Sequence, residues 1–173
     1  MFYKTLITVL LIVFFAAAEE TCQKTCSNFS EKEVKACMET INKRIRITSA
    51  PLKWSCNLAK EAQKWADYLA EKGLFKHEIK DKNGENIYAA AGFHPSLIDA
   101  IRNWYSEKRY FVYGNKFWCE EGHKCGHYTQ LIWKTTKEIG CGISKYKKKY
   151  KGMEYVIVCK FSPPGNILGE QPF

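Results

Sequence analysis

The chain carries eight cysteines, and all of them follow an N-terminal segment with the composition of an export signal. That segment, residues 1–18, places Lys4 before an apolar run and ends in three alanines, which is the order of a cleaved secretory leader. An even number of cysteines behind such a leader indicates a framework of disulfides, because the extracellular environment is oxidising. No two cysteines have Cys-x-x-Cys spacing, which excludes a zinc ribbon and a thioredoxin-like redox motif. We therefore expect an exported, disulfide-linked protein.

The remainder, residues 19–173, has the length and composition of a single packed domain. Aromatic residues make up 14% of the sequence, which favours a sizeable core over disorder. The apolar run of the leader is too short to cross a bilayer, and no later stretch approaches the roughly 20 apolar residues that a membrane helix needs. We expect a secreted, extracellular protein that does not span a membrane. Asn28, in Asn28-Phe29-Ser30, is the only acceptor for N-glycosylation.

Basic residues are in excess, with a formal net charge of +9, and loss of the leader removes one positive charge with Lys4. This balance favours an anionic surface or a host protein as a partner, without naming one. A lysine-rich run between two predicted strands is the candidate contact, although such runs are more often solvated faces, and in an exported protein it does not indicate a nucleic-acid site. Its members are Lys145, Lys147, Lys148, Lys149 and Lys151.

Three amphipathic helices are predicted from apolar residues at helical spacing. The first opens on a capping box of Ser30 and Glu33, Gly73 is placed to end the second, and Pro95 fits the first turn of the third. Their expected ranges are 30–47, 55–73 and 95–108.

The second half of the chain contains the predicted strands. Residues 139–143 and 155–159 are expected to form a hairpin, each strand bearing one cysteine. A short helix is expected around Thr129 to Trp133. The segments 84–88 and 109–121 are predicted to be an ordered turn and an aromatic loop anchored by Cys119, and the tail from Pro163 is expected to lie on the surface.

Four titratable residues are the candidates for chemistry: His77, Glu85, Glu107 and His127. His127 stands beside an apolar run that ends in Trp133, and a lone histidine there would most simply be a buried, hydrogen-bonded one. Two imidazoles and two carboxylates together suit a divalent cation, zinc or magnesium, with the histidines as its first ligands. A purely structural set of ion pairs explains the same residues equally well.

Several motifs resemble those of the CAP superfamily, which comprises cysteine-rich secretory proteins, antigen-5 venom allergens and plant pathogenesis-related proteins. The chain is most similar to the venom allergen-like proteins of parasitic worms. Residues 126–133 fit the principal family signature throughout, and residues 84–87 fit a shorter one. The C-terminal signature is kept only in part, since Lys160 and Phe161 replace a small polar residue and Tyr. In the first-helix signature His-Asn-x-x-Arg, Ile41 precedes Asn42 and Ile45 occupies the Arg position.

The resemblance implies an α+β fold, a three-layer α–β–α sandwich with a small, mostly antiparallel sheet. It also implies a central cavity lined by the four candidate residues, hereafter the tetrad. Among the disulfides, it makes Cys141–Cys159 the most secure pair and Cys22–Cys37 the next. Cys26 and Cys56 are then expected to bond to Cys119 and Cys125, in either order.

Relatives of this kind bind sterols or fatty acids, which makes a secreted, non-enzymatic lipid-binding protein acting at a host–parasite interface the leading hypothesis. Phe111, Tyr113 and Trp118 follow the aromatic-x-aromatic-x₄-aromatic order assigned to sterol binding in relatives. Flat aromatic faces can cover an apolar ring system, although the same residues could simply cap the core. A fatty acid would lie between the first and third helices.

Two alternatives stay open from the sequence. A metal-dependent hydrolase would use the tetrad, with a glutamate as base. However, His77-Glu78 is not completed as His-Glu-x-x-His, because Asp81 holds the last position, and no Gly-x-Ser-x-Gly elbow occurs. The other alternative is a receptor ligand or immunomodulator that acts through the lysine-rich run.

Overall fold

The middle layer of the fold is a four-stranded sheet built on one long hairpin. The computed structural model describes residues 26–46, 49–79, 81–113 and 118–173, so the predicted leader and Cys22 lie outside the described residues. The predicted hairpin is confirmed and is longer than expected, with β5 at Glu138–Tyr150 and β6 at Met153–Ser162. The strand order is β1-β5-β6-β2. β2 (Gly84–Ala90) runs antiparallel to β6, whereas β1 (Lys53–Trp54) runs parallel to β5.

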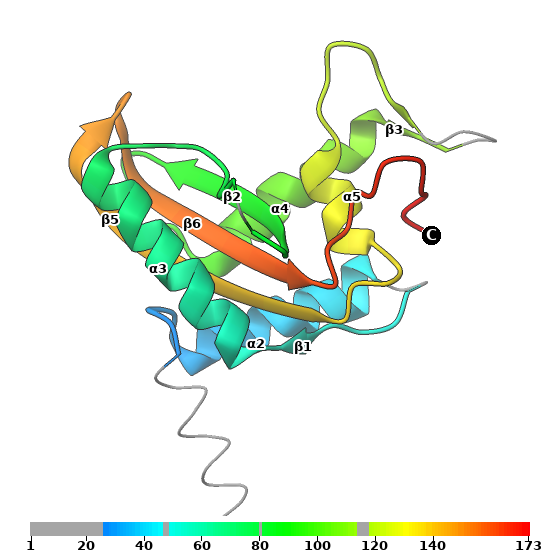
Figure 1. Ribbon diagram of the computed structural model, residues 1–173, viewed down its shortest axis with the longest axis horizontal. Coiled ribbons are helices and arrows are strands. Elements are labelled where there is room, and N and C mark those ends of the chain that lie inside the picture. Colours follow the sequence, from blue (N-terminus) through cyan, green and yellow to red (C-terminus); the bar gives the residue numbers. More distant parts are fainter. Residues whose placement is uncertain (1–25, 47–48, 80, 114–117) are drawn as a thin grey trace, which may run out of the picture.

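Helices cover both faces of this sheet, which gives the expected α–β–α sandwich (Figure 1). α3 (Cys56–Lys72) lies on one face. α2 (Glu31–Thr40), α4 (Leu97–Ser106) and α5 (Gly126–Ile132) pack on the other. None of the helices within the described ranges combines the length and the apolar character that crossing a membrane requires.

Side chains of β6 alternate between two apolar cores. Val156 and Val158 pack with α3, whereas Ile157, Cys159 and Phe161 pack with the three helices on the opposite face. All residues from Val156 to Phe161 are buried, as expected of a strand covered on both faces. The hairpin therefore determines where both helical layers lie.

The predicted ends of two helices follow from local chemistry. The Ser30 and Glu33 capping box is formed at the start of α2, and Gly73 ends α3 with a left-handed φ of 63°. α4 begins two residues after Pro95, because Ser96 and Asp99 form a second capping box there.

A π-helical turn at Ile41–Ile45 explains the irregular first-helix signature. The backbone N–H of Arg46 donates to the carbonyl of Ile41 at 2.8 Å, so Arg46 takes the place that residue 45 would occupy in an α-helix. The buried guanidinium donates to four backbone carbonyls, and two of these close the end of α5. Burial lowers the pKa of Arg46 to about 10. The acceptors are Ala50, Leu131, Trp133 and Thr136.

Two predicted irregular segments are more ordered than expected. Residues 84–88 form most of β2 rather than a turn, because every residue of the strand has a partner on β6. The segment 109–121 contains the end of a 3₁₀ turn (Glu107–Tyr110) and two paired strands, β3 (Phe111–Val112) and β4 (Trp118–Cys119). Short strands of this kind are decided by their partners, so periodicity alone does not reveal them.

Three disulfides join described cysteines. Cys141 and Cys159 are directly opposite on β5 and β6 and are bonded, as the resemblance implies. The expected bonds between Cys26 or Cys56 and the pair Cys119 and Cys125 are wrong. Cys26 bonds Cys56 at the start of α3, and Cys119 bonds Cys125 just before α5, because each pair lies within one local region of the fold. Cys37 is buried and has no partner among the described residues.

The hairpin approaches α3 so closely that β5 requires glycine. A Cβ added to Gly140 would lie 2.6 Å from both the carbonyl carbon of Leu58 and the carbonyl oxygen of Ser55. Gly140→Ala should therefore lower the free energy of unfolding by about 3 kcal/mol, because backbone must move to admit the methyl group. Gly126→Ala is the matched control, since its nearest neighbour would be 3.9 Å away. Thermal unfolding of both variants tests this, and equal melting temperatures would contradict the close approach.

The Cys22–Cys37 bond stays a prediction. Burial raises the pKa of the Cys37 thiol far above its ordinary value, so a free thiol there would resist labelling in the folded protein. Alkylation in denaturant without reductant, followed by peptide mapping, should recover a peptide pair linked through Cys22 and Cys37. An alkylated Cys37 in that map would exclude the bond.

Candidate functional site

Three of the four tetrad residues line a cleft of about 360 Å³ at the β2 edge of the sheet. His77 comes from the loop after α3, Glu85 from β2, and His127 from the first turn of α5. Glu107 does not line the cleft and instead supports His127. The lining residues are His77, Glu85, Asn86, Lys124, Cys125, Gly126, His127 and Asn166.

His127 and Glu107 form the first of two carboxylate–imidazole pairs. His127 Nδ1 is 2.6 Å from Glu107 Oε1. The other carboxylate oxygen accepts the backbone N–H groups of His127 and Tyr128, at 3.0 and 3.2 Å. Glu107 therefore caps α5 and orients the imidazole with the same side chain.

His77 and Glu85 form the second pair. His77 Nδ1 is 2.5 Å from Glu85 Oε1, which also accepts the backbone N–H of Glu78. The imidazole is 64% exposed, whereas the carboxylate is only 6% exposed. The exposed ring is thus held by a nearly buried acid.

The two pairs share one arrangement, which limits what the site can bind. In each, the carboxylate accepts a hydrogen bond from Nδ1, so Nε2 is the ring nitrogen left for coordination. Metal-binding histidines are commonly oriented by such a carboxylate on the other nitrogen. The donor set therefore fits zinc on His77 and His127, with Glu85 and Glu107 supporting the rings rather than binding the ion.

Two asparagines that line the cleft hold α5 by hydrogen bonds. The Asn86 amide donates to the carbonyl of His127. From the C-terminal tail, Asn166 donates to the carbonyl of Gly126 and accepts from the hydroxyl of Thr129. The tail therefore lies beside α5 (Figure 1), and its Asn166 lines the cleft.

Lys160 is an unexpected member of the site. Its side chain is fully buried, and its ammonium contacts carboxylates of Glu78, Asp81 and Glu85, with the first and last at 2.7 Å. We call these four residues the ammonium cluster. Burial by itself lowers the pKa of an ammonium, but the hydrogen bonds to Asp81, Glu78 and Glu85 outweigh it and raise the pKa of Lys160. Lys160 is therefore charged at neutral pH.

Sequence reasoning noted Lys160 only as a departure from the C-terminal signature. The available signal was a lysine inside an otherwise apolar strand, because a buried lysine needs an anionic partner. Its partners could not be identified, since they lie 75 to 82 residues away in the chain.

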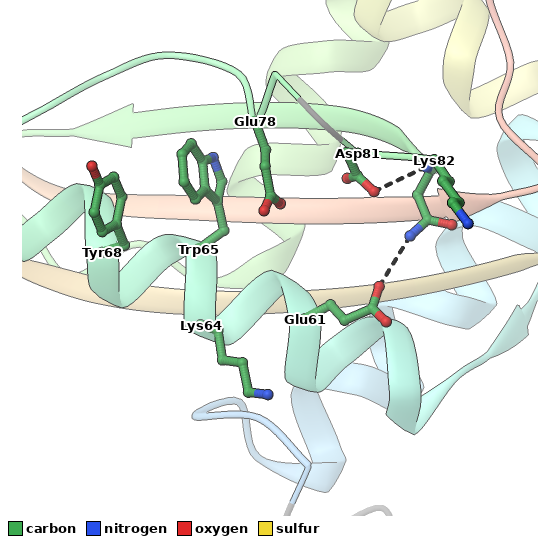
Figure 2. A pocket seen from close by; sticks show the side chains of 8 residues that line it. Glu61, Lys64, Trp65, Tyr68, Glu78, Asp81 and Lys82 are labelled. Carbon is green, nitrogen blue, oxygen red and sulfur yellow. Dashed lines mark hydrogen bonds between the residues drawn. The ribbon is translucent and has the colours of Figure 1, made fainter.

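Glu78 and Asp81 also line an open groove of about 480 Å³ between α3 and the loop that follows it. Figure 2 shows both carboxylates reaching from the loop toward the sheet, while Trp65 and Tyr68 rise from α3. The rings of Trp65 and Tyr68 are stacked, with centroids 4.9 Å apart. The ammonium cluster is thus buried on the Lys160 side and reachable from this groove.

The predicted sterol-binding residues divide into different environments. Phe111 is buried and belongs to the core, whereas Tyr113 is 51% exposed. The ring of Tyr113 stacks on Phe173 with centroids 5.7 Å apart, and its hydroxyl lies 2.6 Å from that of Tyr128. The side chain of Trp118 lies outside the described part of the structure.

A groove of about 550 Å³ adjoins these aromatics. Phe111, Thr129 and Trp133 form one side and residues 166–172 of the tail form the other. Leu168 is 99% exposed at its rim. Lys134 holds the tail through the carbonyls of Pro172 and Phe173. We call this the tail groove.

The lysine-rich run lies at the end of β5 and in the following turn, and all five lysines are exposed. Lys149 pairs with Glu154 at 2.6 Å. Tyr146, interleaved with them, turns inward and donates to the carbonyl of Leu74. Asn28 is also exposed, and its amide nitrogen donates to the carbonyl of Ile143.

Comparison with known proteins agrees with these features. A family model described as the cysteine-rich secretory protein family, CAP, matches residues 44–161. Pathogenesis-related protein PRMS of Zea mays is 35% identical over 131 residues, which cover 75% of each chain. The structure of Schistosoma mansoni venom allergen-like protein 4 is 24% identical and superimposes with a TM-score of 0.58, covering 82% of this chain and 89% of that one. The crystal structure of NaASP2 with Zn²⁺ is 21% identical with a TM-score of 0.61, covering 82% and 83%.

Glu107 should be essential to the local order of α5. Glu107→Ala removes the acceptor of two backbone N–H groups and of an imidazole, which should cost about 2–4 kcal/mol. The exposed Glu121, replaced by Ala, is the control and should change stability little. Chemical denaturation measures both values, and equal effects would contradict the capping role.

Proposed function

Because the chain belongs to the cysteine-rich secretory protein (CAP) family, we propose that it is an exported, non-enzymatic protein that binds a sterol on its aromatic loop. Residues 1–18 act as the leader in this proposal, and residues 19–173 form the single CAP domain. The three disulfides among the described residues support export to an oxidising compartment. Family membership agrees with the expectation of a non-enzymatic protein.

The position of Tyr113 is the observation that carries the proposal. Its half-exposed ring stacks on Phe173 beside the tail groove, and Phe111 closes the same groove from the core side. A flat aromatic face next to an open groove suits a rigid, apolar ring system. Phe111 therefore packs in the core, and a ligand could contact only the edge of its ring. Tyr113 is the residue that a ligand would contact most.

The packing of α2 against α4 favours a sterol over a fatty acid held between these helices. The buried side chains of both helices belong to one core cluster and are at most 1% exposed. A fatty acid could therefore enter only if the two helices moved apart. Close-packed interiors leave little room for such a chain. The buried residues are Val34 and Cys37 of α2 and Leu97, Ala100, Ile101 and Trp104 of α4.

A divalent cation in the cleft is a second, separable part of the proposal, and we do not expect the fold to require it. His77 and His127 would hold the ion through Nε2, while the two glutamates keep the rings oriented. This donor set favours zinc over magnesium, because magnesium prefers oxygen ligands. The zinc-containing structure of NaASP2 supports a cation in a related fold.

The alternatives receive less support. A hydrolase would need a glutamate as base, but Glu85 is held by His77 and Lys160, and Glu107 by His127 and two backbone N–H groups. The exposed lysine-rich run is available for an anionic surface or a host protein. A receptor-ligand role through that run is compatible with sterol binding on the aromatic loop.

Replacing Tyr113 tests the sterol site. Tyr113→Ala should weaken cholesterol binding by tens-fold or more, since losing a buried aromatic contact at a hot spot costs on the order of 2–4 kcal/mol. Tyr113→Phe should retain binding, because it keeps the ring and loses only the hydroxyl contact with Tyr128. Tyr68→Ala is the matched control, an exposed tyrosine on α3. Unchanged cholesterol binding in Tyr113→Ala, with a clearly lower melting temperature, would assign the loop to core capping.

Titration calorimetry with zinc tests the cleft. The wild type should bind one equivalent, and His127→Ala should bind at least about tenfold more weakly, because one of two imidazole ligands is gone. His94→Ala controls for non-specific imidazole binding, since His94 packs on Tyr155 and is not among the residues that line the cleft. Equal zinc binding by wild type and His127→Ala would remove the tetrad from metal binding.

A further inference from the structure

The ammonium cluster has the geometry of a cation site whose cation is part of the chain. Carboxylate oxygens of Glu78, Asp81 and Glu85 lie within 4.8 Å of one another, and within the described ranges no other acidic, histidine or cysteine side chains form such a group of three. The ammonium of Lys160 lies in contact with all three. Three clustered carboxylates repel one another strongly unless a cation lies between them.

The position of Lys160 in the sheet explains why this cation is permanent. Lys160 lies opposite Glu85 on β2 and opposite Gly140 on β5. Its side chain is 0% exposed, while Asp81 and Glu85 are 12% and 6% exposed. The ammonium therefore cannot leave for solvent without breaking the sheet packing around it, and its positive charge stays among the three carboxylates.

We propose that Lys160 is a built-in cation that takes the place of a calcium ion among Glu78, Asp81 and Glu85. Calcium is the divalent ion that three carboxylates with room for water suit best, because it accepts six to eight oxygen ligands in flexible geometry. The groove on the side of α3 supplies the access that an ion and its waters would need (Figure 2).

Glu85 connects this cluster to the cleft. One of its oxygens binds His77 and the other binds Lys160, so neither is left to coordinate an ion in the cleft. Lys160 thereby acts as a positioning residue that keeps the Glu85 carboxylate from serving as a ligand in the cleft. This second part of the inference rests on the proposed zinc site, whereas the replacement of calcium by Lys160 does not.

The test variant is Lys160→Ser, which restores the small polar residue of the C-terminal signature and removes the ammonium. After treatment with chelator, the wild type should show no calcium binding by calorimetry and no calcium-dependent change in melting temperature. Lys160→Ser should melt at a lower temperature and regain about 5–10 °C at a calcium concentration 100 times its dissociation constant. Lys124→Ser is the matched control, because it removes the same charge from the rim of the cleft without touching the cluster.

Several results would overturn the proposal. These are calcium binding by the wild type as tight as that of Lys160→Ser, no calcium-dependent stabilisation of Lys160→Ser, or an equal gain in Lys124→Ser. A Lys160→Ser protein that remains unfolded at saturating calcium would also overturn it, because the ion then does not replace the ammonium.

A zinc titration separates this inference from the proposed zinc cleft. The double variant Lys160→Ser, His127→Ala should keep calcium-dependent stabilisation and lose zinc binding. Absence of zinc binding in the wild type would contradict the cleft and leave the calcium result intact. Magnesium binding in the wild-type cleft through Glu85 would contradict the positioning role of Lys160.

Discussion

Burial of the β5–β6 hairpin on both faces is the constraint on which the rest of the structure depends. Because β6 is covered on each side, its alternating side chains provide two cores at once, and each α-helix of the described residues packs on one or the other. The same burial forces α3 so close to β5 that Gly140 cannot carry a side chain. It also leaves a charged residue in the buried stretch from Val156 to Phe161 without water, so Lys160 must find its counter-charges inside the protein.

The Glu85 carboxylate is one of the counter-charges of Lys160 and also belongs to the candidate site. It lies opposite Lys160 in the sheet and shares its two oxygens between the ammonium and His77. Glu107 plays a parallel part on the other side of the cleft, where one carboxylate both caps α5 and orients His127. In each pair the acid serves the backbone or a buried charge as well as the imidazole. Stability and ring orientation are therefore coupled in this cleft.

Much of the secondary structure could be predicted because its causes are local. The Ser30 capping box, the stop at Gly73 and the hairpin strands follow from residues within a few positions of one another. The predictions that were wrong concern partners distant in sequence. β2 looked like a turn because its order comes from β6, and the disulfide partners of Cys56 and Cys125 depend on which segments fold side by side. The first-helix signature is a similar case. Ile45 occupies its Arg position in the sequence, but one π-helical turn brings Arg46 into that place in the structure.

The sequence by itself determined the family through a continuous signature, and the resemblance to that family implied the layered fold class and the four residues of the tetrad. Periodicity specified the individual helices and the hairpin strands, because these are local features. Only the tertiary structure decided what those residues do to one another. It placed Glu107 behind His127 rather than in the cleft, divided Phe111 from Tyr113 between core and surface, and brought Lys160 to three carboxylates. Contacts across 75 or more residues depend on how whole elements pack, and no local pattern encodes that packing.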